Sequence, residues 1–173
     1  MENKVLECMK TRRSIRNYQD KPVPPELLNQ ILDAGLYAPS GMGKQSSVIV
    51  AVQDPETVKL LDQMNAEIMG REHPYYGAPV ILLVFGDTER NTFVEDASCM
   101  LQNLMLAAHS LGLATCWIHR EREMFASKRG KALMKQWGLS ETLCGVGGLA
   151  LGYAAGEIPE AAPRREGRII TIA

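Results

Sequence analysis

The sequence predicts a mixed fold, in which several helices pack in layers against a sheet of four or five strands. Three observations support this class. Apolar stripes at helical spacing alternate along the chain with short runs rich in β-branched residues, and the longest stripe is apolar enough for a central core helix. The 173 residues are enough for one core, and we find no repeat or linker, so a single domain over residues 1–173 is expected.

Turn and cap signals set the elements of the N-terminal half. Pro24 and Pro25 mark a helix start, because proline suits the first turn of a helix, and Asp54 is placed to cap a later helix. Residues 38–45 carry a proline and two glycines, which indicates a loop in which backbone amides can approach a ligand closely. The expected elements are helices at about 6–11, 24–37 and 54–69, with a buried strand at 47–52.

The C-terminal half contains the predicted core helix, which spans about residues 91–113. The other expected elements are strands at about 79–85, 114–118 and 145–153 and a helix at 121–137. The β-branched segment 168–172 is a further strand, without a neighbour in sequence. An unpaired terminal strand is an aggregation hazard, and pairing it with a second subunit would remove the hazard.

Composition excludes several classes of partner. Lys plus Arg (19) nearly balances Asp plus Glu (20), so the chain as a whole offers no field that would hold a nucleic-acid backbone. The N-terminus lacks an apolar signal segment, and no stretch is long enough to span a bilayer. We therefore expect a cytoplasmic protein with neither a nucleic-acid nor a membrane partner.

The residue types that usually carry metal or acid–base chemistry are scattered. The four cysteines and three histidines show no metal-ligand spacing, and no Ser, His and acid trio is evident. Residues 145–150 match a dinucleotide-binding pattern formally, but too little chain follows, so these glycines are interpreted as allowing close packing against a ring or a helix. We predict no metal site and no catalytic side chain, and we expect a bound cofactor to perform the reaction.

Three arginines lie within five residues, at Arg12, Arg13 and Arg16, together with Ser14. Guanidinium groups bind phosphate oxygens in pairs, so the cluster suits one doubly charged anion. A solvated basic turn after a helix is the alternative. A second basic pair, Arg164–Arg165, near the far end of the chain is compatible with one shared phosphate site or with two unrelated surface patches.

Several segments in a fixed order resemble the flavin-dependent nitroreductases of the small single-domain type. The resemblance covers nearly the whole chain, and its motifs are strong only in combination. They are Arg12–Arg16 with Tyr18, Ala38–Gly41 with Gln45, Ala78–Pro79, Gln102–Ala108 running into Leu111–Ile118, Leu151–Tyr153 and Pro163–Arg164.

This resemblance implies an α+β fold with a central, mostly antiparallel sheet flanked by helices. It also implies a homodimer in which the C-terminal strand is exchanged with the partner subunit, and in which FMN lies at the interface and contacts both subunits. The isolated segment 168–172 would find its neighbour in this way.

The resemblance also assigns roles to individual residues. The FMN phosphate would be held by Arg12, Arg16 and Arg164, with Arg165 as a compensating charge. Arg13 and Ser14 would contact the ribityl or pyrimidine side, and Asn65 the pyrimidine edge. The backbone near Ile118 and His119 would donate a hydrogen bond toward flavin N5. The second subunit would line the flavin with Pro39, Ser40, Gly41 and Gln45.

The chain departs from its relatives at three places. Gly43, Ser46 and Ser47 are small where a bulky pair is common, His119–Arg120 replaces a glycine pair, and Ala162 replaces a lysine. The first change opens one wall of the pocket, and the second brings cationic groups near the ring, which favours an acidic substrate or a cofactor phosphate. Substrate is expected near Met69, His73, Tyr75 and Tyr76.

The resemblance implies an FMN-dependent oxidoreductase. It would take hydride from NADH or NADPH and pass it to a nitroaromatic, a quinone or a similar small flat acceptor in a ping-pong cycle. An alternative keeps FMN and changes the reaction to reductive dehalogenation or to oxidation of a ring in biosynthesis. An alternative of a different class is a flavin-binding or regulatory protein without turnover.

Overall fold

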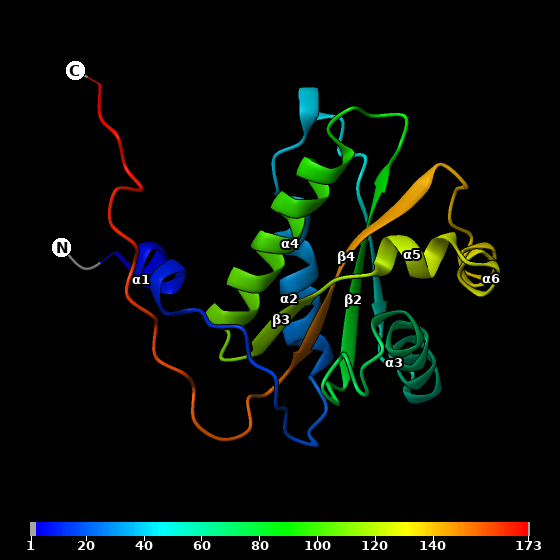
Figure 1. Cartoon of the computed structure of the whole chain (residues 1–173), viewed down its shortest axis with the longest axis horizontal. Helices are drawn as coiled ribbons and strands as arrows, with labels where there is room; N and C mark the ends of the chain where they lie inside the picture. The colour runs from blue at the N-terminus through cyan, green and yellow to red at the C-terminus, as the bar shows by residue number, and fades with distance from the viewer. Residues whose placement is uncertain (1–2, 173) are drawn as a thin grey trace.

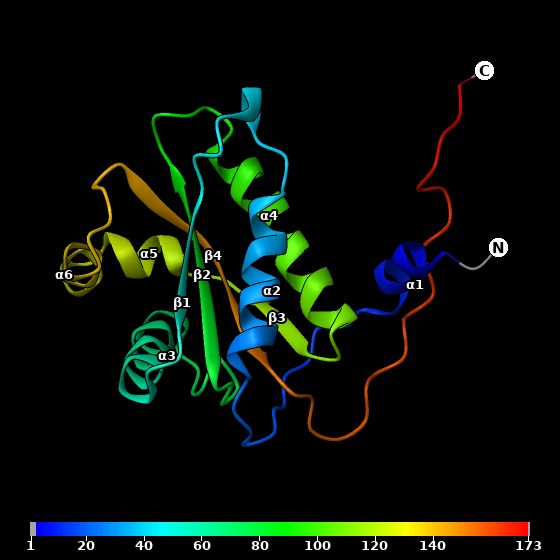
Figure 2. The same cartoon turned by 180° about the vertical axis from the view of Figure 1, so that it is seen from behind.

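The computed structural model describes residues 3–172 and arranges them as one four-stranded sheet with helices on both faces (Figure 1). Helices α2 and α4 cover one face, and α3, α5 and α6 lie on the other (Figure 2). The elements in chain order are α1 (Lys4–Thr11), α2 (Pro25–Leu36), the 3₁₀ helix η1 (Gly41–Gly43), β1 (Val48–Val52), α3 (Pro55–Met69), β2 (Val80–Asp87), α4 (Phe93–Ser110), β3 (Ala114–Ile118), α5 (Glu121–Ala126), α6 (Lys128–Gln136) and β4 (Leu143–Gly152).

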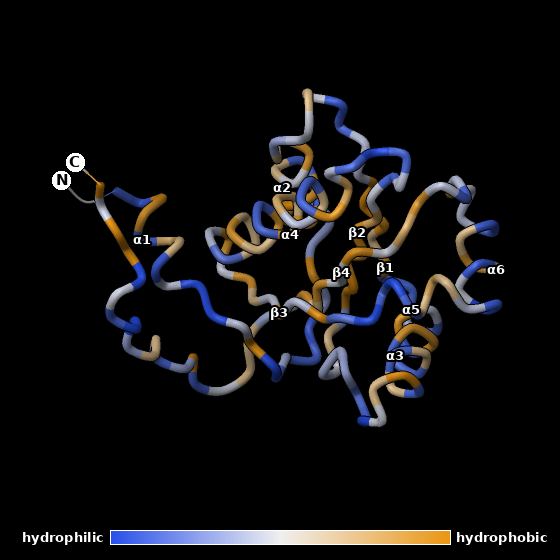
Figure 3. The backbone as a smooth tube through the Cα atoms, turned by 45° about the horizontal axis from the view of Figure 1, so that its top comes forward, coloured by the Kyte–Doolittle hydropathy of each residue, from blue (hydrophilic) through white to orange (hydrophobic). Residues whose placement is uncertain are grey.

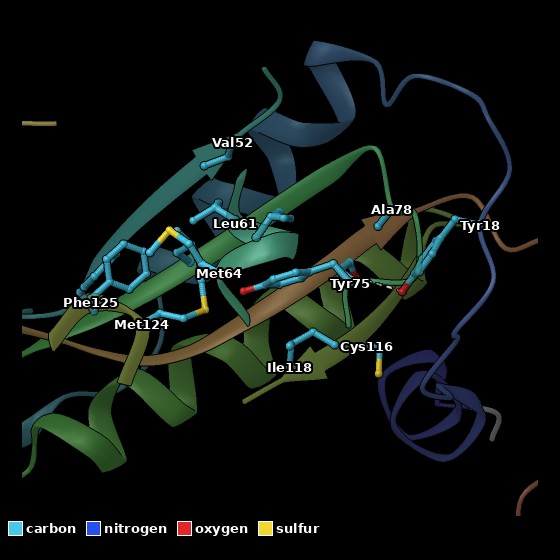
Figure 4. Close-up of a cluster of buried hydrophobic side chains, with 14 of the residues drawn as sticks. Tyr18, Val52, Leu61, Met64, Tyr75, Ala78, Cys116, Ile118, Met124 and Phe125 are labelled. Carbon is cyan, nitrogen blue, oxygen red and sulfur yellow. Dashed lines mark hydrogen bonds between the residues drawn. The ribbon is translucent and has the colours of Figure 1, made fainter. Parts of the chain in front are cut away.

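The sheet has the order β1-β2-β4-β3, and every neighbouring pair is antiparallel. Strand β2 is buried on both faces, which explains its continuous apolar sequence. Its side chains alternate between two cores, as the period of two requires. Ile81, Leu83 and Phe85 belong to the core on the α3 and α5 side, and Val80, Leu82 and Val84 to the core under α2 and α4. Figure 4 shows part of the first core, including Leu61 and Met64 of α3 and Phe125 of α5.

The α+β fold expected from the resemblance is confirmed, and most boundaries agree within two or three residues. Asp54 caps α3 as predicted, since its carboxylate accepts a hydrogen bond from Thr57 N at 2.8 Å. Helix α4 is the core helix, with Leu101 and Leu104 fully buried.

The single helix predicted at 121–137 is wrong, because the structure has two helices divided at Ser127. Ser127 adopts an extended conformation, and its Oγ accepts from Gly130 N at 3.0 Å while donating to the Met124 carbonyl at 2.6 Å. Serine favours such caps over helix interiors, because its hydroxyl competes for backbone partners. A Cβ at Gly130 would overlap the Met124 carbonyl, so this turn also needs a glycine.

The strand predicted at 47–52 is present, but it is not buried. Strand β1 is the edge of the sheet, and Val52 alone among its residues is buried. A β-branched run therefore identified a strand without revealing its position in the sheet.

The C-terminal tail forms no strand within the described residues. It leaves β4, passes beside α1 and carries an exposed apolar stretch near its end (Figures 1 and 3). Ile169, Ile170 and Ile172 are each more than 80% exposed, at 88%, 83% and 89%. Helix α1 likewise buries none of its residues, and Val5 is 62% exposed.

Among residues 3–172, no helix combines the length and the apolar character that crossing a bilayer would require.

Candidate functional site

The arginine cluster follows α1 directly and lies at the outer edge of β3. Ser14 forms a parallel bridge with Thr115, and Ile15 N donates to the Thr115 carbonyl at 3.0 Å. The segment is fixed by Ile15 and Tyr18, which are buried, and the Tyr18 hydroxyl donates to the Ile15 carbonyl at 2.7 Å. Since side chains alternate along an extended segment, Arg12, Ser14 and Arg16 share the face opposite Ile15.

The positive charges of the cluster have no carboxylate partner within residues 3–172. Arg12 is half-buried, and its Nη1 is buried without a hydrogen-bond acceptor. Arg13 differs, because its Nη1 donates to the carbonyls of Lys10 at 2.7 Å and Arg12 at 2.6 Å. Its guanidinium group thereby caps the C-terminal end of α1. Arg12 and Arg16 are therefore the charges left available to an anion.

Two neighbouring pKa values reflect the field of the cluster. Partial burial lowers the pKa of His109, and the charges of Arg12 and Arg13 lower it further. Burial raises the pKa of the Cys116 thiol, while Arg16, Arg12 and a hydrogen bond from Ser14 oppose this shift. The cluster thus gathers around the start of β3.

The structure does not join Arg164 and Arg165 to this cluster within one chain. Both are exposed in the tail, and Arg164 Nε donates to the nearby Ala162 carbonyl at 3.1 Å. Among the described residues, no hydrogen bond or ion pair links either residue to Arg12 or Arg16.

The loop at 39–45 lies at the top of the molecule in Figure 1, well apart from α1. Gly41 N donates to Asp96 Oδ1 at 2.9 Å, and the Ser40 hydroxyl accepts from Gln45 N at 2.9 Å. Pro39 and Gln45 are exposed, and Gln45 has a left-handed backbone with φ of 51°. This loop and the arginine cluster cannot meet on one ligand within a single chain of this shape.

The end of β3 presents its backbone to the open edge of the sheet. The Thr115 carbonyl faces outward to Ile15, and backbone groups of an antiparallel strand alternate in direction, so the backbone of Trp117 should also face outward. Ile118 faces β4, and its side chain is 5% exposed. His119 lies beyond the last paired residue of β3, and its carbonyl accepts a hydrogen bond from the buried Asn65 side chain.

A cavity of about 490 Å³ adjoins this strand end. Trp117 and His119 stack there with ring centroids 5.9 Å apart, next to Val94 and Ser98 of α4. Arg120 and Arg122 line the same cavity, and Arg120 pairs with Glu123 at 3.0 Å. Its charged lining side chains are two arginines and one glutamate, so positive charge predominates.

Asn65 does not occupy the position expected of it. The side chain is fully buried, and its Nδ2 donates to the carbonyl of His119 at 2.8 Å. It has no exposed atom to offer to a pyrimidine edge, so the predicted direct contact is wrong for this conformation. Asn65 instead holds the end of β3 from within.

Tyr75 was expected beside the substrate, but it is only 1% exposed. Its ring lies in the core between Ile118 and Met64 (Figure 4), and its hydroxyl donates to Glu121 Oε1 at 2.7 Å. Burial, then the charge of Glu121, raises the pKa of Tyr75 well above its ordinary value. Tyr75 is therefore a structural residue and not a stacking surface.

Sequence reasoning missed Glu121, which is 1% exposed at the start of α5. Burial raises the pKa of its carboxyl to about 7, although the hydrogen bond from Tyr75 opposes the shift. The signal that points to it is the glycine-rich strand β4. A Cβ at Gly148 would lie 2.5 Å from Glu121 Oε1, and one at Gly145 would lie 2.6 Å from the Glu121 carbonyl oxygen.

The close-packing interpretation of the strand glycines is confirmed. Besides the two contacts with Glu121, a Cβ at Gly147 would lie 2.6 Å from Trp117 Nε1, so the strand approaches a ring and a helix as expected. In the described part of the chain, no three His, Cys, Asp or Glu residues are grouped so that they could hold a metal ion.

Comparison with known proteins agrees with this geometry. The model of the Nitroreductase family matches residues 9–74 and 66–153. A protein of Methanothermobacter thermautotrophicus, provisionally named NADH dehydrogenase/NAD(P)H nitroreductase, is 39% identical over 121 residues. This match covers 65% of the chain but only 59% of that relative.

Solved structures match over the whole chain. A nitroreductase from Bacteroides fragilis with bound FMN superimposes with a TM-score of 0.92 at 30% identity, covering 99% of this chain and 100% of that one. A nitroreductase from Desulfitobacterium hafniense, also with bound FMN, gives a TM-score of 0.89 at 27% identity, with complete coverage of both chains.

Proposed function

The chain belongs to the nitroreductase family, and on this premise we propose that it is an FMN-dependent oxidoreductase. The electron donor is NADH or NADPH, and the acceptor is a small flat molecule such as a nitroaromatic or a quinone. When bound, FMN supplies the two-electron chemistry between donor and acceptor. The chain's own residues bind the cofactor, orient it and shape the acceptor site.

The observation that carries this proposal is the unpaired charge of Arg12 and Arg16. The Nη1 of Arg12 is buried without an acceptor, which is costly unless a ligand supplies one. A phosphate dianion provides the charge and the several acceptors that two guanidinium groups require. Ser14, on the same face, adds a hydroxyl toward the same group, whereas Arg13 mainly holds the segment in place.

The end of β3 is the second part of the proposed site. The amide of His119 is the candidate donor to the flavin ring, at the point where the reduced ring would gain charge. Ile118 anchors this segment in the core, and Asn65 fixes the carbonyl of His119 at 2.8 Å. Asn65 thus acts through His119 and does not touch the cofactor.

We propose that two copies of the chain complete each site. Arg164 and Arg165 would reach a phosphate on the exchanged tail, and the loop carrying Pro39, Ser40, Gly41 and Gln45 would come from the second copy. The exposed apolar residues of α1 and of the tail support this arrangement, since Ile169 and Ile170 have no packing partner among residues 3–172. In this proposal the whole chain, 1–173, is one FMN-binding domain of a cytoplasmic homodimer.

The cationic cavity beside β3 favours an acceptor that carries an acidic group. Arg120, Arg122 and His119 would place positive charge near such a group. Within the proposed class of acceptors, we therefore favour flat molecules that carry a carboxylate or a similar anionic group.

The test begins with the absorbance spectrum of the purified protein. We expect a yellow protein that releases FMN on denaturation, and bleaching of the flavin band when NADH or NADPH is mixed in a stopped-flow instrument. A colourless protein that also fails to bind added FMN would contradict the proposal. Bound FMN that neither nicotinamide reduces would instead favour the regulatory alternative.

A further inference from the structure

Three polar side chains are enclosed together behind the end of β3. Asn65 of α3, Tyr75 of the turn before β2 and Glu121 of α5 are 0%, 1% and 1% exposed. We call these three residues the buried corner. The Tyr75 hydroxyl connects the other two residues. It donates to Glu121 Oε1 at 2.7 Å, and it lies within hydrogen-bonding reach of the Asn65 side chain.

The buried corner contains more acceptors than donors. Tyr75 donates its hydroxyl to Glu121 Oε1, and Asn65 donates Nδ2 to the His119 carbonyl. Two buried acceptor atoms then have no hydrogen-bond partner, namely Glu121 Oε2 and Asn65 Oδ1. One proton on Oε2 would convert an unpartnered acceptor into a donor, and would remove an isolated buried charge at the same time.

We propose that Glu121 is a positioning residue whose protonated carboxyl completes the hydrogen bonding of the buried corner and thereby fixes the His119 end of β3. The corner connects directly to that end, because Asn65 bonds the carbonyl of His119 and Glu121 starts the next helix two residues later. This inference rests on the proposed function, in which the amide of His119 contacts FMN.

The charged surroundings of Glu121 favour the neutral acid. No cation forms an ion pair with it among the described residues, and Glu123 on its own helix adds a further negative charge. Behind Tyr75, Asp62 accepts from Tyr75 N at 2.9 Å and pairs with exposed His73 at 3.2 Å. From β4, Gly148 leaves space for the carboxyl and Gly145 for the Glu121 backbone, while hydrogen bonds from the backbone of Glu121 and Gly148 lower the pKa of the carboxyl and so oppose the effect of burial. These groups agree with a carboxyl pKa of about 7.

The consequence is an affinity for FMN that depends on pH. Below neutral pH the corner carries no charge, and in this proposal the segment 118–120 is held in one position. Above neutral pH an unpaired charge is forced into the interior, and the corner must open or admit water. Binding of FMN should therefore weaken as Glu121 loses its proton, through linkage between the two equilibria.

The test compares the wild type with Glu121→Gln, which keeps an acceptor, supplies a permanent donor and cannot ionise. FMN dissociation constants are measured by fluorescence between pH 6 and pH 8.5. We expect the wild-type constant to rise about tenfold more over this range than that of Glu121→Gln. Glu67→Gln removes an exposed carboxylate on α3 and should keep the wild-type profile.

Infrared spectroscopy provides a second measurement that needs no cofactor. The apoprotein should show the carbonyl stretch of a buried carboxylic acid at pH 6, and this band should disappear by pH 9. Its absence in Glu121→Gln assigns it. If that variant fails to fold, a shift of the band in Tyr75→Phe assigns it instead.

The outcomes separate the two proposals. Identical pH profiles for the wild type and Glu121→Gln, or no acid band at pH 6, would overturn the role of Glu121 while leaving the proposed function intact. Failure of every variant to bind FMN at any pH would overturn the proposed function and the positioning role together.

Discussion

The arginine cluster lies beside the start of β3 and the buried corner lies behind its end, and both contain polar atoms without hydrogen-bond partners. In the corner, Glu121 Oε2 is enclosed by the chain's own residues, so a change of protonation is the means available to satisfy it. In the cluster, Arg12 is half-buried and Arg16 is exposed, and neither has a carboxylate partner among residues 3–172; in the proposed function an external anion supplies one. An unpartnered polar atom in the interior therefore points to a change of protonation of its own group. An unpartnered polar atom near the surface points to a bound ligand.

The largest expected effect comes from removing the end of the tail. In the proposed dimer this loss would take the exchanged tail of the second copy away from the arginine cluster, and it would leave the buried corner intact. Deletion of residues 168–173 should abolish dimer formation and weaken FMN binding by more than about a hundredfold, since hydrophobic and strand pairing contacts are lost together. Light scattering and FMN titration measure both quantities. Ile170→Val is the matched control and should behave as the wild type, whereas a truncated monomer with full activity would contradict the exchange.

The second largest effect is a pH dependence of the unfolding free energy, which we expect from the buried corner and not from the arginine cluster. The folded-state pKa of Glu121, about 7, exceeds its ordinary value of 4.5, so the folded protein holds the proton more tightly. Stability is then fully present below pH 4.5 and falls by about 3 kcal/mol as pH rises to 7. Chemical denaturation of Glu121→Gln at several pH values should show no such loss relative to the wild type. Parallel curves for the two proteins would contradict the buried titration.

A smaller effect is expected from Gly148→Ala, which crowds the corner without changing its charge. The added methyl group would approach Glu121 Oε1 at 2.5 Å and Tyr75 Oη at 3.2 Å. We expect a loss of about 2 kcal/mol in the free energy of unfolding. In a Glu121→Ala background the same substitution should cost much less, so a double-mutant cycle measures the coupling. Equal costs in the two backgrounds would show that Gly148 does not serve the corner.

The smallest effect on the fold should come from the arginine cluster. Arg16→Ala should raise the FMN dissociation constant about tenfold through lost charge-assisted hydrogen bonds, while the unfolding free energy of the apoprotein changes by less than about 0.5 kcal/mol. Arg129→Ala, which breaks an exposed ion pair with Glu67 of 2.6 Å, is the control and should leave FMN binding unchanged. An equal loss of stability and FMN binding in Arg16→Ala would make the cluster structural.

Local signals in the sequence were sufficient for most elements and for finding the arginine cluster. Pro24–Pro25 and Asp54 begin helices because their effects reach only a few residues. The arginines were recognisable because they are adjacent along the chain, and they share one extended segment beside β3.

The buried corner was not predictable in the same way, because its parts come from distant segments. Asn65 and Glu121 meet only through the packing of α3 and α5, and Tyr75 stands in a polar stretch that suggested an exposed loop. A glutamate at the start of a helix is ordinary, since it favours the helix dipole. Its burial follows from the glycines of β4, which are 24 and 27 residues further along, at Gly145 and Gly148.

Gly145, Gly147 and Gly148 of β4 carry a consequence for how related sequences can diverge. Gly147 makes room for the Trp117 indole, Gly148 for the Glu121 carboxyl and Gly145 for the Glu121 backbone. A larger residue at 148 is then tolerable only if position 121 becomes smaller, and the same exchange applies to 147 and 117. We expect the residues at these paired positions to change together across homologous chains, so that a larger side chain at one position is accompanied by a smaller one at the other.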